Sequence, residues 1–216
     1  MANSSIEGLG TAQTGYVDST DKLAIQKSGK TFAEEITMSD LFGGWADLTP
    51  FQYEIGTGPN APAFIAIQGD DYGWSFGVGD EMWMLYHMNH NILPASIDAV
   101  AKMFLHVHWQ TNGVHTGAPR WQLDYTMAHG HNTANYPAMS QLHLQEVAQG
   151  SAYRHMITED AVGVATPDID TLIKVHVKRV ASTGTENTDT VFMDGIDWHI
   201  PTMMVASKNR APDFYA

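Results

Sequence analysis

Alternation of apolar and polar residues with a period of two is the main pattern along this chain. In RWQLDYTMA (120–128), every second residue is apolar: Trp121, Leu123, Tyr125 and Met127. TLIKVHVKRVA (171–181) repeats the pattern with Ile173, Val175 and Val177. Because successive side chains of a strand point to opposite faces, both segments are predicted to be half-buried β-strands.

Further segments rich in aromatic and β-branched residues predict more strands. They are AFIAIQG (63–69), WSFGVGDEMWMLYHM (74–88), ASIDAVAKMFLHVHW (95–109), SAYRHMITE (151–159) and ENTDTVFMDGIDWHI (186–200). SQLHLQEVA (140–148) fits either a strand or a short helix. Strands recurring roughly every 10–20 residues, with Gly, Pro and Asn between them, favour a sandwich over alternating β and α units. The chain is therefore predicted to be all-β, with a jelly-roll-like antiparallel sandwich over residues 45–216.

The first 44 residues are predicted to form a separate extended arm and hairpin. Residues 1–20 are small and polar without periodicity, and Gly43-Gly44 marks a boundary. Between them, Leu23 and Ile25 alternate with polar residues, Ser28-Gly29 suits a turn, and residues 32–36 can return as a second strand. An isolated hairpin of this size is at best marginally stable in water. It must therefore dock on its own domain or on another protein.

Composition narrows the range of functions. Asp and Glu number 24 against 11 Lys and Arg, a formal net charge of −13, which disfavours binding to nucleic acid. The chain has no cysteine, so disulfides and thiolate chemistry are excluded. MANSSIEGLG has neither the basic nor the apolar region of a signal peptide, and no apolar run reaches 18 residues, so no membrane insertion is expected.

Two short motifs carry residues that could bind a metal. His106 and His108 lie two apart in FLHVHWQ, and Asp197 and His199 lie two apart in GIDWHI. Residues two apart share one face of a strand, so the two strands could converge on a divalent cation, which imidazole and carboxylate ligands suit. The alternative interpretation is structural, because strand histidines also serve as half-buried amphipathic side chains. No cofactor is predicted, and the metal remains an alternative.

Other chemistries fit the sequence less well. A cupin-like metal-dependent enzyme would place a glutamate soon after the H-x-H motif, whereas no acidic residue follows before Asp124. Alternatively, three copies of the H-x-H strand around a three-fold axis could supply six imidazoles to one octahedral iron ion. No nucleophile elbow is present, so no catalytic residues are predicted and the protein is expected to be non-enzymatic. Trp74, Trp83 and Tyr86 could stack on carbohydrate, although aromatic residues at this density are typical of a core.

Three segments together resemble bacteriophage virion proteins of the fibre, spike or decoration type. They are DKLAIQKSGKTFAEEITMSDLF (21–42), FLHVHWQTNGVHTGAPRWQLDYTMAHGHN (104–132) and VFMDGIDWHIPTMMVASKNRAPDFY (191–215). In the second block of those proteins the two strands form a hairpin. After the histidine of the third block they continue with an aromatic residue and Gln, where Ile200-Pro201 stands here.

This resemblance implies a structural subunit of a virion, assembled in the host cytoplasm. Its partners would be other virion proteins (capsid, portal or tail) and two further copies of itself in a homotrimer. A host surface receptor or glycan is an alternative partner. The N-terminal segment would attach the subunit to the particle through apolar side chains, namely Leu23, Ile25, Phe32, Ile36, Leu41 and Phe42.

Overall fold

The computed structural model describes residues 22–25, 34–37, 44–55, 60–130 and 135–202. Residue contacts divide the chain into two units, Met1–Leu41 and Phe42–Ala216. The boundary between residues 44 and 45 stays a prediction. Among the described residues, no helix is long and apolar enough to cross a bilayer.

The first unit contains the two strands expected of a hairpin. β1 (Lys22–Ile25) and β2 (Glu34–Thr37) pair antiparallel, with Leu23 opposite Ile36. Three of the apolar residues predicted to attach the chain to a particle therefore lie in strands: Leu23, Ile25 and Ile36. The other three, Phe32, Leu41 and Phe42, lie outside the described residues.

The second unit is an antiparallel β-sandwich, as predicted. The strands of its five-stranded sheet are, in spatial order, β10 (Ser140–Gln145), β9 (Arg120–His129), β13 (Thr171–Val180), β7 (Glu81–His87) and β4 (Gln52–Ile55). β9 and β13 hold the two segments with the clearest alternation, and they are neighbours over ten residue pairs. Residues 140–145 form a strand, so of the two structures predicted for this segment the strand is confirmed and the short helix is wrong.

The other sheet has seven strands. Its main order is β11 (Met156–Glu159), β8 (Lys102–Thr111), β14 (Val191–Thr202), β6 (Asp71–Ser75) and β5 (Ala63–Gln68), with β12 (Val164–Ala165) on β8 and β3 (Gly44–Leu48) on β14. β8 and β14 carry the two predicted metal motifs, and they lie side by side at the centre of the sheet.

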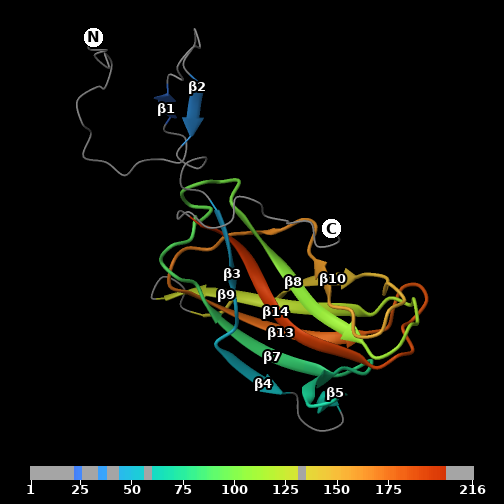
Figure 1. The fold of residues 1–216 in the computed structure, drawn as a ribbon. Coiled ribbons are helices and arrows are strands. Elements are labelled where there is room, and N and C mark those ends of the chain that lie inside the picture. The colour runs from blue at the N-terminus through green and yellow to red at the C-terminus, as the bar shows by residue number, and fades with distance from the viewer. Residues whose placement is uncertain (1–21, 26–33, 38–43, 56–59, 131–134, 203–216) are drawn as a thin grey trace. The chain divides into compact units, whose positions relative to one another are not determined.

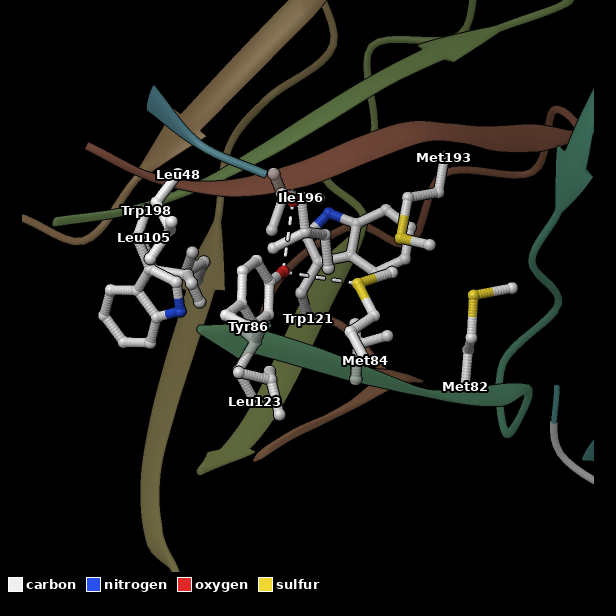
Figure 2. Packing of buried hydrophobic residues seen from close by; sticks show 14 of the residues in the cluster. Leu48, Met82, Met84, Tyr86, Leu105, Trp121, Leu123, Met193, Ile196 and Trp198 are labelled. Carbon is white, nitrogen blue, oxygen red and sulfur yellow. Dashed lines mark hydrogen bonds between the residues drawn. The ribbon is translucent and has the colours of Figure 1, made fainter. Parts of the chain in front are cut away.

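The core lies between the two sheets (Figure 1). Trp121 and Leu123 enter it from β9, while Leu105 and Trp198 enter it from the seven-stranded sheet. Figure 2 shows a buried hydrogen bond that joins the two sheets across this core. The Tyr86 hydroxyl, on β7, donates to the Ile196 carbonyl oxygen, on β14, at 3.1 Å. The inward faces predicted from alternation in β9 and β13 are confirmed by this packing.

One expectation from the resemblance is wrong: β8 and β9 do not form a hairpin. β8 pairs with β11, β12 and β14, whereas β9 pairs with β10 and β13. Residues 112–119 therefore cross from one sheet to the other. The Asn187 side-chain amide donates to the carbonyls of His115 and Gly117, at 3.1 and 2.9 Å. Asn187 lies in the connection from β13 to β14, which also crosses between the sheets. The two crossing connections are thus hydrogen-bonded to each other, and residues 112–119 form a crossover in place of the expected hairpin turn.

Gly117 explains how the two connections approach so closely. A Cβ atom at this position would lie 2.3 Å from the Glu186 carbonyl oxygen, closer than real Cβ atoms come. Glycine is therefore required where residues 112–119 pass the connection from β13 to β14. Both connections lie next to the pair of Thr111 and Val191, where β8 ends and β14 begins.

Candidate functional site

Strand pairing places the four predicted metal ligands on one face of the seven-stranded sheet. His106 on β8 lies directly opposite Asp197 on β14, and His199 lies opposite Phe104. The alternate residues Leu105 and Val107 point into the core. The histidines therefore occupy the outer face, the one turned away from the five-stranded sheet.

Three of these four side chains converge on one point. Asp197 Oδ1 lies 3.5 Å from His106 Nδ1 and 3.4 Å from His108 Nε2. One ligand atom from each of the three lies within 4.8 Å of the others. The carboxylate thus stands between two imidazoles, an arrangement that suits either a hydrogen-bonded network or a shared cation.

His199 belongs to a second, overlapping group. Its ligand atoms gather with those of His106 and Asp47, again within 4.8 Å of one another. Asp47 lies on β3 directly opposite His199. The rings of Trp45 and His199 form a T-shaped pair with centroids 5.2 Å apart. Asp47 is exposed, so this second group opens to solvent.

The two histidines of β8 have further partners on the other side of the strand. His106 Nε2 lies 2.8 Å from Glu159 Oε2, and these residues are opposite one another on β8 and β11. His108 Nδ1 lies 2.9 Å from His155 Nε2, with the two rings stacked. The sequence pattern did not indicate Glu159, His155 or Asp47 as members of the site. The pairing of β11 with β8 brings Glu159 and the preceding His155 to the histidines of β8, and the pairing of β3 with β14 brings Asp47 to His199.

The cluster is buried although it lies on the outer face. His106 is 3% exposed, His199 6% and Asp197 7%. Phe104 and Trp45 pack together beside them, with ring centroids 5.9 Å apart. Gly163 closes over Phe104, because an added Cβ there would lie 2.7 Å from the ring. Trp45 also packs against the His199 ring, so aromatic side chains cover part of this group. We call His106, His108, Asp197 and His199 the buried row.

Burial lowers the pKa of each of three imidazoles at this site, and the neighbouring charges decide whether the net shift is up or down. For His108, burial alone lowers the pKa, but Asp197 and more distant aspartates together raise it above the usual value. For His199, burial and the neighbouring His106 lower the pKa. Burial and His108 also lower the pKa of His155. The carboxylate between the β8 histidines thus favours positive charge at His108, which is the charge a bound cation would supply.

A second candidate site lies at the β5–β6 edge of the same sheet. Phe64 and Tyr72 are 56% and 55% exposed, and their rings stack at a centroid distance of 6.0 Å. Trp74 lies beside Phe64 at 4.8 Å. These aromatic side chains line a hollow of about 420 Å³ together with Asp71, Gln110 and Asp194. Flat apolar rings beside carboxylate and amide groups can bind a ligand that has both apolar faces and hydroxyl groups.

No known protein family matches this sequence, and no curated protein matches it either. Among solved structures, the chain is matched to a xylan-binding module, CBM15, at 7% sequence identity. The match covers 72% of this chain and 95% of that one, with a TM-score of 0.33. A TM-score this low does not relate the functions of the two chains.

Proposed function

We propose that this protein is a non-enzymatic structural subunit of a bacteriophage particle. In this role the N-terminal segment attaches to a capsid, portal or tail protein, the β-sandwich is displayed, and three copies assemble together. The three sequence blocks that resemble virion proteins support the proposal. The two-part organisation of the chain agrees with it.

The observation that carries the proposal is the small hairpin, which belongs to a different unit of the chain from the sandwich. β1 and β2 have four residues each and form a two-stranded sheet of their own, in the unit Met1–Leu41. The sandwich has its own hydrophobic core. A two-stranded sheet is marginally stable alone in water. The hairpin is therefore suited to gain its stability from a partner protein.

Deletion of residues 1–42 from the phage gene tests this role. The shortened protein should fold, as measured by circular dichroism, but should be absent from purified particles, as measured by mass spectrometry. The double variant Leu23→Asp/Ile36→Asp should have the same effect, because it places charge on two opposite residues of the hairpin. Val162→Asp is the matched control, because Val162 is 71% exposed on the sandwich. Incorporation of the shortened protein at full occupancy would contradict the proposal.

A second candidate function is binding of a host surface glycan by the sandwich. The exposed aromatic pair Phe64 and Tyr72, beside the carboxylates of Asp71 and Asp194, favours this role. Tyr72→Ala should abolish binding to an array of bacterial surface glycans. Phe51→Ala is the control, because Phe51 is equally exposed at 59% and precedes β4 in the other sheet. Equal binding by the wild type and Tyr72→Ala would exclude this site.

A further inference from the structure

We infer that His106, His108 and Asp197 bind one divalent transition-metal ion, with zinc as the representative. The donor atoms are Nδ1 of His106, Nε2 of His108 and Oδ1 of Asp197. Two imidazoles and one carboxylate are a ligand set used for zinc, iron and related ions. This inference does not depend on the proposed role in a virion, because it rests only on the geometry of β8 and β14.

The distances between the donor atoms fit a metal better than they fit direct hydrogen bonds. Ligands bound about 2.1 Å from a tetrahedral zinc ion lie roughly 3.4 Å from one another. Asp197 Oδ1 lies 3.5 Å from His106 Nδ1 and 3.4 Å from His108 Nε2. Charge-assisted hydrogen bonds between nitrogen and carboxylate oxygen are shorter, about 2.7–2.9 Å. Asp197 Oδ1 is thus spaced from both imidazole nitrogens as two ligands of one ion would be, and all three donor atoms lie within 4.8 Å of one another.

The central oxygen of this group lacks a hydrogen bond. Within the described part of the chain, Asp197 Oδ1 is buried and accepts none. A buried carboxylate oxygen without a donor is unfavourable, so native proteins nearly always satisfy it. A cation coordinated by this oxygen would remove the penalty and would use the two facing imidazole nitrogens at the same time.

The outer nitrogens of both histidines are already engaged. His106 Nε2 contacts Glu159 Oε2 at 2.8 Å, and His108 Nδ1 contacts His155 Nε2 at 2.9 Å. Metal-binding histidines usually donate their second N–H to such a partner, which fixes the tautomer and aims the first nitrogen at the ion. Glu159 and His155 are therefore positioning residues. They leave Nδ1 of His106 and Nε2 of His108 to face Asp197.

There is also room for a further ligand. Gly195 lies directly opposite His108, and an added Cβ at this position would meet no atom within 4 Å. Three protein ligands leave at least one coordination position for water or for a group from another molecule. The ion would join β8 to β14 and would stabilise the folded state, because the donors come together only there.

Metal titration of the full-length protein tests this inference. The protein is stripped with a chelator, dialysed, and titrated with zinc sulfate or cobalt chloride. We expect one ion per chain, and a rise in Tm of about 5–10 °C when free zinc is 100-fold above Kd. Cobalt should give the strong visible absorption of a four- or five-coordinate site. A wild-type protein that binds no zinc and shows no shift in Tm would overturn the inference.

Five variants locate the ion, the fifth being His199→Gln in the second group. His108→Gln and Asp197→Asn should abolish binding, and Glu159→Gln should weaken it about 10- to 100-fold. His176→Gln is the matched control and should bind normally. His176 also lies on a strand between two carboxylates, 3.2 Å from Glu81 and 3.7 Å from Asp124, but within the described residues it belongs to neither group that could hold a metal ion.

The folding of each variant is checked by circular dichroism before metal is added. Two further outcomes would overturn the inference. One is unchanged stoichiometry in His108→Gln and Asp197→Asn. The other is loss of binding in His199→Gln with retention in His108→Gln, because that result would place the ion with Asp47 and His199 instead.

Discussion

The outer faces of the two sheets carry the same local arrangement with different surroundings. On the seven-stranded sheet, His106 lies between Glu159 and Asp197. On the five-stranded sheet, His176 lies between Glu81 and Asp124. His106 is 3% exposed, whereas His176 is half-buried under the stacked ring of Trp83. A strand histidine between two carboxylates is therefore not by itself a special site.

The difference comes from what surrounds each histidine. His106 has a second imidazole, that of His108, two residues away, and Phe104 and Trp45 pack beside the row. The neighbours of His176 along its strand are Lys174 and Lys178, which remain partly exposed. On that face Lys178 Nζ lies 3.9 Å from Glu81 Oε2, and glutamine amides donate to Asp124. The buried Asp197 carboxylate instead faces two imidazoles, and an ion pair or a cation is needed to offset the cost of burying it. Burial thus separates a candidate binding site from an ordinary amphipathic surface.

The largest expected effect comes from removing each central histidine from metal-free protein. His106→Ala should lower the free energy of unfolding by roughly 3 kcal/mol, because it removes an imidazole from the buried Asp197 carboxylate and from the partly buried Glu159 carboxylate. His176→Ala should lower it by less than about 1 kcal/mol, because His176, Glu81 and Asp124 are all in partial contact with solvent, which screens their charges, whereas His106 and Asp197 are buried. Urea unfolding with unchanged m values measures both. Equal losses would show that burial does not distinguish the two faces.

An intermediate effect is expected from the aromatic cover of the buried row. Gly163 has φ +72° and lies against the Phe104 ring, so Gly163→Ala should cost about 2 kcal/mol. Gly69 has φ +59° with nothing within 4 Å of an added Cβ, so Gly69→Ala should cost about 1 kcal/mol from backbone strain alone. Thermal unfolding of the two variants gives the difference. If they unfold alike, Phe104 moves aside freely and does not close the row.

The smallest effect is expected on the five-stranded face. Lys174 Nζ lies 4.1 Å above the centre of the Tyr136 ring. Lys174→Ala should lower the free energy of unfolding by about 0.5 kcal/mol, and Lys174→Arg should preserve it, because both cations can interact with the ring. Urea unfolding in low and high salt measures this contribution. A loss above about 2 kcal/mol would mean that this face is more tightly coupled to the core than its exposure indicates.

Much of the sandwich was predictable because alternation reports a half-buried strand directly. Trp121 and Leu123 point inward from β9, and Ile173 and Val175 point inward from β13, as the pattern indicated. β8 was harder to interpret, because both of its faces are buried and its sequence shows a nearly continuous apolar run. The crossing at residues 112–119 was not predictable, because its partner Asn187 lies far along the chain.

The candidate site was predictable only within each strand. The spacing of two residues correctly placed His106 with His108 and Asp197 with His199 on shared faces. Whether the two pairs meet depends on the register of β8 and β14, which Cα partners such as His106 and Asp197 now define. Glu159 reaches His106 only through the pairing of β11, a strand of four residues with no motif of its own.

The position of β14 has a consequence for synthesis of the chain on the ribosome. β14 pairs with β3, β6 and β8, and it is the last strand that the structure describes. All strands of the five-stranded sheet are translated before β14. The five-stranded sheet can therefore form while its apolar face is not yet packed against the complete seven-stranded sheet. Folding then waits for long-range pairing, which is slow and leaves hydrophobic surface exposed. The nascent sandwich is therefore a natural client for a chaperone until Val191–Thr202 emerges.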